Sequence, residues 1–145
     1  MTEETDAARA AGMAKMDEVY GFHVDPDTVP GPYVDVTVDH LFGAIWTREA
    51  LGMRDRRLLT IGVLAALGKD DLCEIQFRSA LERGELDVEQ VREVVLHLTH
   101  YIGWPLSTGV NASAEKVIAA RAKSVASAPP AGTTASTTGP GEGTP

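Results

Sequence analysis

The sequence predicts an all-α fold, and three observations predict it. Apolar residues recur at helical spacing in each long segment. No segment alternates apolar and polar residues with a period of two over several positions, as a strand with one buried face would. Glycines and prolines stand where such helices would begin or end. The chain of 145 residues has the length of one domain, and we expect the folded unit to span residues 5–122.

The first third of the chain predicts two helices around a loop. Residues 5–20 are rich in alanine and methionine, which are good helix formers, and Gly21 follows as a stop. Residues 21–36 hold three prolines, so we expect a long loop that could cover something. Asp39–Trp46 is predicted as a short helix.

The remaining helices are predicted at Asp55–Leu67, Asp70–Arg83, Val88–Ile102 and Pro105–Lys123. The first of them is apolar nearly all round, so we expect it to be buried in the core or between subunits. Asp87 and Gln90 have the spacing of a capping box for the third. Pro105 can open the last as its first residue.

The end of the chain predicts a disordered tail. The last residues read ASAPPAGTTASTTGPGEGTP, with no aromatic or large aliphatic side chain. Such a segment cannot bury enough apolar area to offset the cost of ordering its backbone, about 1–2 kcal/mol per residue. We therefore predict disorder over residues 127–145.

Charge and cysteine content exclude several classes of protein. The net charge of −8 repels phosphate backbones, so no nucleic-acid partner is expected. A single cysteine, Cys73, excludes a disulfide scaffold and an intrachain Cys-x-x-Cys site. No apolar run approaches the roughly 18 residues of a membrane span, so no membrane association is expected. The acidic N-terminus lacks the features of a secretory signal, and we expect a cytoplasmic protein.

The most concentrated group of chemically useful side chains lies on the helix before Gly103. Glu93, His97 and Tyr101 are spaced i, i+4, i+8 and therefore share one face. A carboxylate can hold the tautomer of an imidazole, and a tyrosine can donate to a developing anion, so the three could transfer protons. The same spacing also fits an ordinary surface pair or buried hydrogen bonds.

Other readings of the polar residues stay open. Glu93, His97 and His100 resemble a carboxylate-plus-two-histidine metal set, but no further ligand is evident and we predict no metal. Arg48 and Arg56 could bind a substrate carboxylate, or form ion pairs at the surface or between subunits. Trp46 is expected in the core or in a pocket wall.

Four motifs follow one another along the chain. They consist of Phe42, Gly43, Trp46, Arg48 and Leu51; Arg56, Leu58 and Leu64–Gly68; Ala80, Leu81 and Gly84; and Glu93, Val94, Val95, Tyr101, Gly103 and Pro105. In order and spacing, over about residues 8–120, they resemble the carboxymuconolactone decarboxylase family.

The resemblance implies an all-helical fold of the alkylhydroperoxidase D (AhpD) type. It also implies homo-oligomers, commonly trimers or hexamers, with sites near subunit interfaces. The family's named reaction is the cofactor-free loss of CO2 from 4-carboxymuconolactone. In such an enzyme we expect His97 as general acid/base, oriented by Glu93, with Tyr101 donating to the oxyanion. We expect the small-molecule substrate to be bound by Gln76, Arg56, Arg48, Trp46 and His100.

The chain departs from the family pattern at several positions that carry chemistry. Gln76 stands where the family usually has a histidine, and an amide cannot exchange a proton near neutral pH. The Cys-x-x-Cys, histidine and glutamate of the peroxidase branch are replaced by Lys69, Leu72, Gln76 and Arg57, so thiol peroxidase activity is disfavoured. Three hypotheses remain: a lyase acting on a carboxylated lactone or similar unsaturated acid, a cofactor-free isomerase or cyclase, and a non-catalytic oligomeric binding protein.

Overall fold

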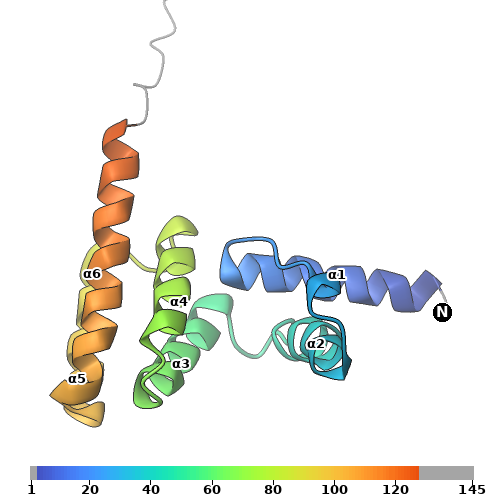
Figure 1. The fold of residues 1–145 in the computed structure, drawn as a ribbon, viewed down its shortest axis with the longest axis horizontal. Coiled ribbons are helices and arrows are strands. Elements are labelled where there is room, and N and C mark those ends of the chain that lie inside the picture. Colours follow the sequence, from blue (N-terminus) through green and yellow to red (C-terminus); the bar gives the residue numbers. More distant parts are fainter. Residues whose placement is uncertain (1–2, 128–145) are drawn as a thin grey trace, which may run out of the picture.

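The computed structural model describes residues 3–127, in which helices joined by loops are found and no strand. The elements are α1 (Glu3–Tyr20), the 3-10 turn η1 (Pro26–Thr28), α2 (Pro32–Val36), the π-helix η2 (Thr37–Ile45), α3 (Met53–Ala66), α4 (Asp70–Glu82), α5 (Val88–Ile102) and α6 (Trp104–Ser127). Figure 1 shows their arrangement. The predicted all-α class is confirmed for the part of the chain that is described.

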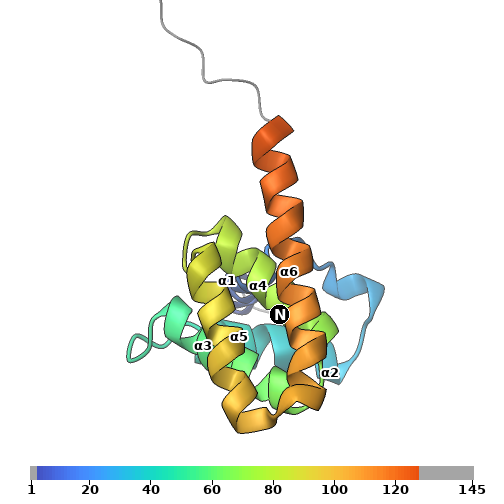
Figure 2. The same cartoon turned by 90° about the vertical axis from the view of Figure 1, so that its left-hand side faces the viewer.

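Helices α3 to α6 form the main bundle (Figure 2), in which α6 packs against both α4 and α5 and α3 packs against α4. Its core is one continuous cluster of apolar side chains, among them Ile61, Phe77, Val91 and Val110, all completely buried. The capping box predicted at Asp87 is present, because its carboxylate accepts from the Gln90 N–H and its own N–H donates to the Gln90 side chain.

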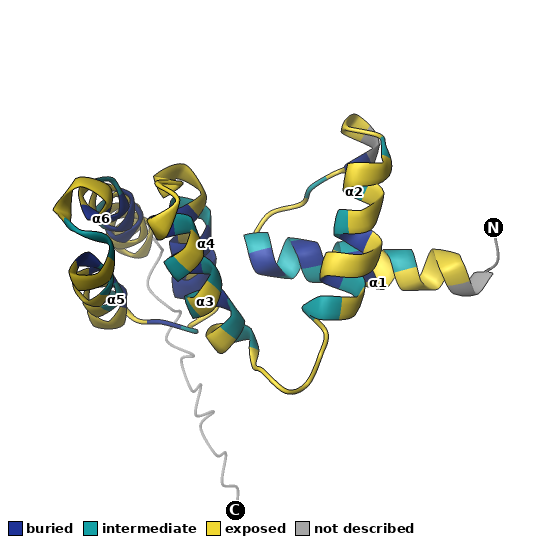
Figure 3. Cartoon of the chain, turned by 90° about the horizontal axis from the view of Figure 1, so that it is seen from below, coloured by how far each residue is buried: buried dark blue, intermediate teal, exposed yellow. Residues whose placement is uncertain are grey.

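Helices α1, α2 and η2 form a second body, the N-terminal unit, which extends to one side of the main bundle (Figures 1 and 3). Its core is small: the buried apolar side chains are Met16, Val19, Val38 and Phe42. α1 crosses η2 so closely that a Cβ atom at Gly12 would lie 2.4 Å from the carbonyl oxygen of Val38. Glycine is therefore what allows this crossing.

The proline-rich segment is more ordered than expected. The prediction of an uninterrupted loop over residues 21–36 is wrong, because η1 and α2 lie within it. Proline is favoured in the first turn of a helix, and Pro32 begins α2 in that way. The helix predicted at Asp39–Trp46 is present two residues earlier and as a π-helix, in which the N–H of Trp46 donates to the carbonyl of Leu41.

Helix α3 is buried on one stripe only. That stripe consists of Arg57, Ile61 and Ala65, which are spaced four apart and face the bundle. The other face carries Leu59, Val63 and Leu67 and is exposed. Complete burial within the chain is therefore wrong for α3, since its neighbours cover only one side of it. Burial between subunits stays a prediction.

Helix α6 is longer than predicted. It begins one residue before Pro105 and ends at Ser127, so the first residue of the predicted tail is helical. Residues 128–145, the rest of that tail, lie outside the described residues. The end of α6 over residues 119–127 is exposed throughout and projects beyond the bundle (Figure 2). No described helix has the length and apolarity that a membrane crossing requires.

Candidate functional site

Two of the predicted catalytic residues line one pocket on the main bundle. This pocket, the His97 pocket, has a volume of about 310 Å³ and is lined by Leu58 of α3 and by Glu93, Val94, His97 and Leu98 of α5. Three of its five side chains are aliphatic. It therefore sets one carboxylate and one imidazole against an apolar wall.

The helical period of α5 explains this placement. Val91, Val95 and Thr99 face the core, and residues on the opposite side of the helix face outward. Tyr101 is next to His97 on that outer face, with its ring centroid 5.0 Å from the imidazole centroid. Glu93 and His97 are exposed and Tyr101 is 78% exposed, so solvent reaches all three groups in the single chain.

Gln76 lies elsewhere, in a buried polar network centred on Arg57. The Arg57 side chain is completely buried and paired with Glu85, with Nε 2.5 Å and Nη2 3.2 Å from the two carboxylate oxygens. Its Nη1 donates to the carbonyl of Val19 and to Oε1 of Gln76, both at 2.8 Å. The network joins the N-terminal unit to α3 and α4.

Gln76 also lines a second pocket, the Gln76 pocket, of about 130 Å³. Its walls come from α1, α3 and α4 and consist of Tyr20, Thr60, Leu64, Leu72, Ile75 and Gln76. Burial, with the nearby Tyr33, raises the pKa of the Tyr20 hydroxyl. Since no residue is shared with the His97 pocket, Gln76 and His97 do not meet in one site within this chain.

Of the two arginines predicted as substrate anchors, Arg56 lies in the first turn of α3 and Arg48 on the loop before it. Arg56 is held by the preceding loop, because its Nη2 donates to the carbonyl of Arg48 at 2.8 Å and its Nε to that of Leu51 at 3.2 Å. Arg48 is exposed on that loop. Neither side chain lines the His97 pocket.

The two aromatic candidates also lie apart from His97. Trp46 stacks on Phe42 at the edge of the N-terminal core, with ring centroids 6.1 Å apart. The ring of His100 meets Trp104 edge-on, and its Nδ1 lies 2.9 Å from the carbonyl oxygen of Leu96. Within residues 3–127, no three His, Cys, Asp or Glu side chains are grouped so that they could hold a metal ion.

Cys73 is a core residue. Its Sγ lies 3.9 Å from the carbonyl oxygen of Ile61, and burial, together with Asp70 and Asp71, raises the pKa of the thiol to about 11. A reactive cysteine needs an accessible thiolate. Cys73 therefore has the surroundings of a packed core residue and not those of an accessible nucleophile.

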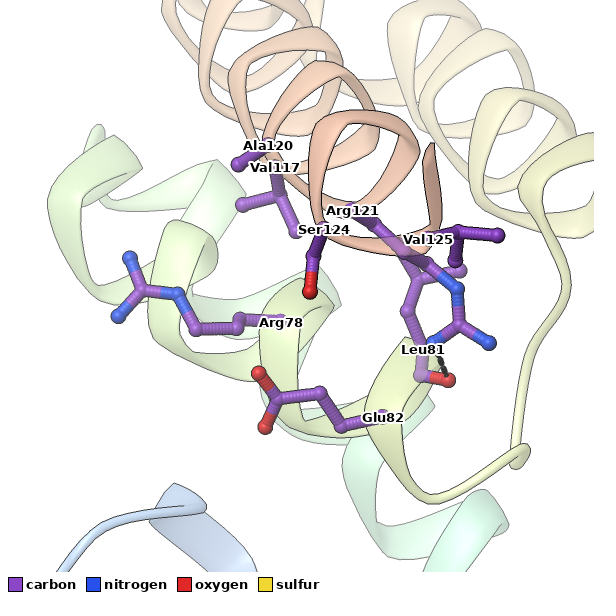
Figure 4. Close-up of a pocket in the computed structure, with 8 residues that line it drawn as sticks. All are labelled: Arg78, Leu81, Glu82, Val117, Ala120, Arg121, Ser124 and Val125. Carbon is purple, nitrogen blue, oxygen red and sulfur yellow. Dashed lines mark hydrogen bonds between the residues drawn. The ribbon is translucent and has the colours of Figure 1, made fainter. Parts of the chain in front are cut away.

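A further pocket, of about 350 Å³, lies between α4 and the end of α6, and none of the predicted residues lines it (Figure 4). Arg121 bends over its edge and donates to the carbonyl of Leu81. Arg78 points away from Arg121 and pairs with Glu74 at 2.8 Å. Both guanidinium groups therefore already have partners.

Two curated proteins each match about half of the chain. It is 34% identical over 76 residues to the 4-carboxymuconolactone decarboxylase of Acinetobacter baylyi, which covers 52% of this chain and 56% of that protein. It is 33% identical over 82 residues to the nitrosuccinic acid decarboxylase npaB of Metarhizium robertsii, covering 55% and 54%. The chain thus spans about half the length of these relatives.

No solved structure matches the chain. The sequence profile of the carboxymuconolactone decarboxylase family matches residues 32–123, which run from α2 to the exposed part of α6. This match includes every residue of the His97 pocket and all of the predicted site residues. The chain belongs to the carboxymuconolactone decarboxylase family.

Proposed function

We propose that the protein is a cofactor-free decarboxylase of a small, electron-poor carboxylic acid, with its site in the His97 pocket. The observation that carries the proposal is that Glu93 and His97 line one pocket with three aliphatic side chains, with Tyr101 next to His97. Both relatives described above are named as decarboxylases, which supports this class of reaction.

The named substrates of the relatives share one chemical feature. A lactone in one and a nitro group in the other can accept the electron pair that a departing carboxylate leaves behind. In the proposed reaction the bond from carbon to the carboxylate breaks, CO2 leaves, and the pair delocalises onto the acceptor oxygen. Tyr101 donates a hydrogen bond to that oxygen, and His97 then returns a proton to carbon while Glu93 orients the imidazole.

The pocket is open in the single chain, and we propose that a second copy completes it. The exposed face of α3, formed by Leu59, Val63 and Leu67, belongs to the helix that also supplies Leu58 to the pocket. Covering that face would bury apolar area and exclude water from His97, which strengthens electrostatic contacts there. This accords with the trimeric or hexameric AhpD-type assembly that the family resemblance implies.

The substrate-binding roles of the remaining residues also belong to the proposal. Arg48 is the freer carboxylate anchor, because the Arg56 guanidinium already donates to two backbone carbonyls. Trp46, His100 and Gln76 lie outside the His97 pocket in the single chain, so substrate binding by any of them at that pocket would require the second copy to supply it.

A non-catalytic binding protein is the second candidate, and the exposure of Glu93, His97 and Tyr101 favours it. The decisive experiment offers 4-carboxymuconolactone and nitrosuccinic acid to the full-length protein and measures CO2 release and product. We expect turnover of one acid, at least 100-fold slower in His97→Ala and unchanged in His40→Ala, which alters an exposed histidine of η2.

Each other outcome identifies an alternative. Full activity in His97→Ala contradicts the assigned role. Conversion of a ring substrate without CO2 release indicates an isomerase or cyclase. Saturable binding with no conversion indicates the binding protein.

A further inference from the structure

We propose that the pocket between α4 and the end of α6, the Arg121 pocket, binds a small organic acid that joins one carboxylate to a compact apolar body. This pocket is separate from the His97 pocket and from the Gln76 pocket, because it shares no lining residue with either. Its walls come from the main bundle alone. Binding of the acid there is independent of the proposed decarboxylation.

Arg121 is a cation that no acid balances. Its Nη1 donates to the carbonyl of Leu81, as the dashed line in Figure 4 shows. No carboxylate pairs with it among the residues that the structure describes. A backbone carbonyl satisfies an N–H group but does not neutralise the positive charge, so the guanidinium keeps that charge for a ligand.

The bond to Leu81 also orients the guanidinium. The group is a planar fork of five N–H donors, and Nη1 lies on the side of the fork that Leu81 occupies. On the opposite edge, Nε and Nη2 have no partner within residues 3–127. Two parallel N–H groups along one edge match the two oxygens of a carboxylate. Because the side chain is already held at one point, less of its freedom is lost when a ligand binds.

The charges around the pocket favour an anion. Arg78 lines the pocket and pairs with Glu74, but Glu74 also pairs with Lys116, each at 2.8 Å, so one carboxylate serves two cations. Glu82 is the one acid among the lining residues, and its carboxylate points away from Arg121 in Figure 4. Arg78, Lys116 and Arg121 therefore stand against two carboxylates, and one ligand carboxylate would restore the balance.

The rest of the pocket fits an apolar body of limited size. Leu81, Val117, Ala120 and Val125 line it, and the first two are almost completely buried. The volume of about 350 Å³ is near the lower end of the range for ligand pockets, about 300–1,000 Å³. A single ring would cover this apolar wall while its carboxylate reaches Arg121, whereas an inorganic anion would leave the wall bare.

The test titrates the full-length protein at neutral pH with benzoate, benzamide and inorganic phosphate. NMR follows the side-chain Nε–H signal of Arg121 and the backbone amides of the lining residues. We expect benzoate to shift these signals with a Kd of about 1 mM, as suits a ligand of about nine non-hydrogen atoms. Benzamide has the same shape without the charge, and phosphate has a charge without the apolar body, so each should bind at least about tenfold more weakly.

Variants separate the charge from the space. Arg121→Met removes the charge and keeps an apolar stem, and should weaken benzoate binding at least about tenfold. Arg121→Lys keeps the charge without the fork and should fall between wild type and Arg121→Met. Ala120→Leu fills the pocket from an exposed position of α6 and should block binding without removing a charge. Ala122→Leu, the same change at an exposed position that does not line the pocket, is the matched control and should bind as wild type.

The acid of the pocket gives a test in the opposite direction. Glu82→Gln removes a negative charge from the lining and should strengthen benzoate binding, by about twofold or more, because like charges repel. For all variants, binding is followed on the backbone amides of Leu81 and Val117.

The proposal is overturned if benzamide or phosphate binds as tightly as benzoate, if Ala120→Leu retains wild-type affinity, if Glu82→Gln weakens binding, or if benzoate shifts only residues of the other two pockets. If Arg121→Met does not fold, the comparison of benzoate with benzamide and the Ala120→Leu variant still decide. Because binding is measured without turnover, at residues outside the His97 pocket, the result stands whether or not the protein releases CO2 from any acid.

Discussion

The N-terminal unit and the main bundle are stabilised in different ways. The bundle has a continuous apolar core shared by α3 to α6, whereas the N-terminal unit buries only four apolar side chains. The described contacts between them include two polar ones, with Arg57 bonded to the Val19 carbonyl and Arg83 paired with Glu18 at 2.6 Å, beside the apolar packing of Met53 on the N-terminal core. Polar junctions depend on geometry more than apolar ones do, so the two bodies should differ in stability and separate at this junction.

The His97 and Gln76 pockets differ in which of these two bodies supplies their walls. The His97 pocket belongs entirely to the bundle, while the Gln76 pocket needs Tyr20 from α1. Loosening the N-terminal unit should therefore abolish one pocket and spare the other.

The largest expected loss of stability comes from replacing one large buried side chain in each core by alanine. Phe77→Ala should destabilise the whole protein by about 3–5 kcal/mol, because Phe77 is completely buried in the bundle. Phe42→Ala should unfold the N-terminal unit while hydrogen exchange in α4 to α6 stays slow. Equal loss of protection throughout in Phe42→Ala would show that the two bodies unfold as one.

The junction itself is the next target. Arg57→Met removes the partner of Glu85, which is only 11% exposed, and should cost about 3–5 kcal/mol in urea unfolding. The control is Arg92→Met, because Arg92 makes a two-point pair with Glu115 that is open to solvent. We expect that variant to lose much less stability than Arg57→Met, because solvent screens an exposed ion pair. Similar losses in the two variants would contradict the role of burial at the junction.

Replacing two glycines by alanine should change the stability of the protein in opposite directions. Gly12→Ala places a methyl group against the Val38 carbonyl and should destabilise the N-terminal unit by about 1–3 kcal/mol. Gly62→Ala meets only Leu98, at an ordinary 3.8 Å, and should stabilise α3 by about 0.5–1 kcal/mol. Thermal melts of both variants test this, and a neutral Gly12→Ala would mean that α1 can move away from η2 at no cost.

The smallest expected effects are changes of stability with pH, caused by one titrating group in each body. Asp17, 2.7 Å from His23, raises the pKa of that imidazole above its ordinary 6.5, so the pair stabilises the N-terminal unit at low pH and loses its effect as pH rises through the folded pKa. In the main bundle the titrating group is Cys73, which affects stability at higher pH. The Cys73 thiol has an ordinary pKa of 9.0 and a folded one of about 11, so stability falls as pH rises between these values, where the unfolded chain alone ionises, and the loss persists at higher pH.

Unfolding free energies measured against pH should therefore show two separate declines. His23→Gln should remove the first and Cys73→Ala the second. A first decline that persists in His23→Gln would assign it to another group.

Periodicity was enough to predict much of this arrangement. It predicts the all-α class, the ranges of α4 and α5 to within a residue, and the shared outer face of Glu93 and His97. Each of these depends on contacts between residues a few positions apart, which sequence spacing describes well.

The sequence reasoning missed Arg57 as the centre of a buried network. One signal was available: residues 57, 61 and 65 share a stripe, and the last two are apolar, so an inward arginine followed from the pattern. The separation of Gln76 from His97 had no such signal, because it depends on how α3 packs between α4 and α5. Pro32 was misread because proline both ends and begins helices.

The projecting end of α6 has a practical consequence. Residues 119–127, at about 1.5 Å per residue, extend about 13 Å along the helix from the last buried turn. A fluorescent reporter or surface tether joined after Ser127 would be connected to the bundle by a helical spacer. The orientation of such a fusion would follow the helix axis.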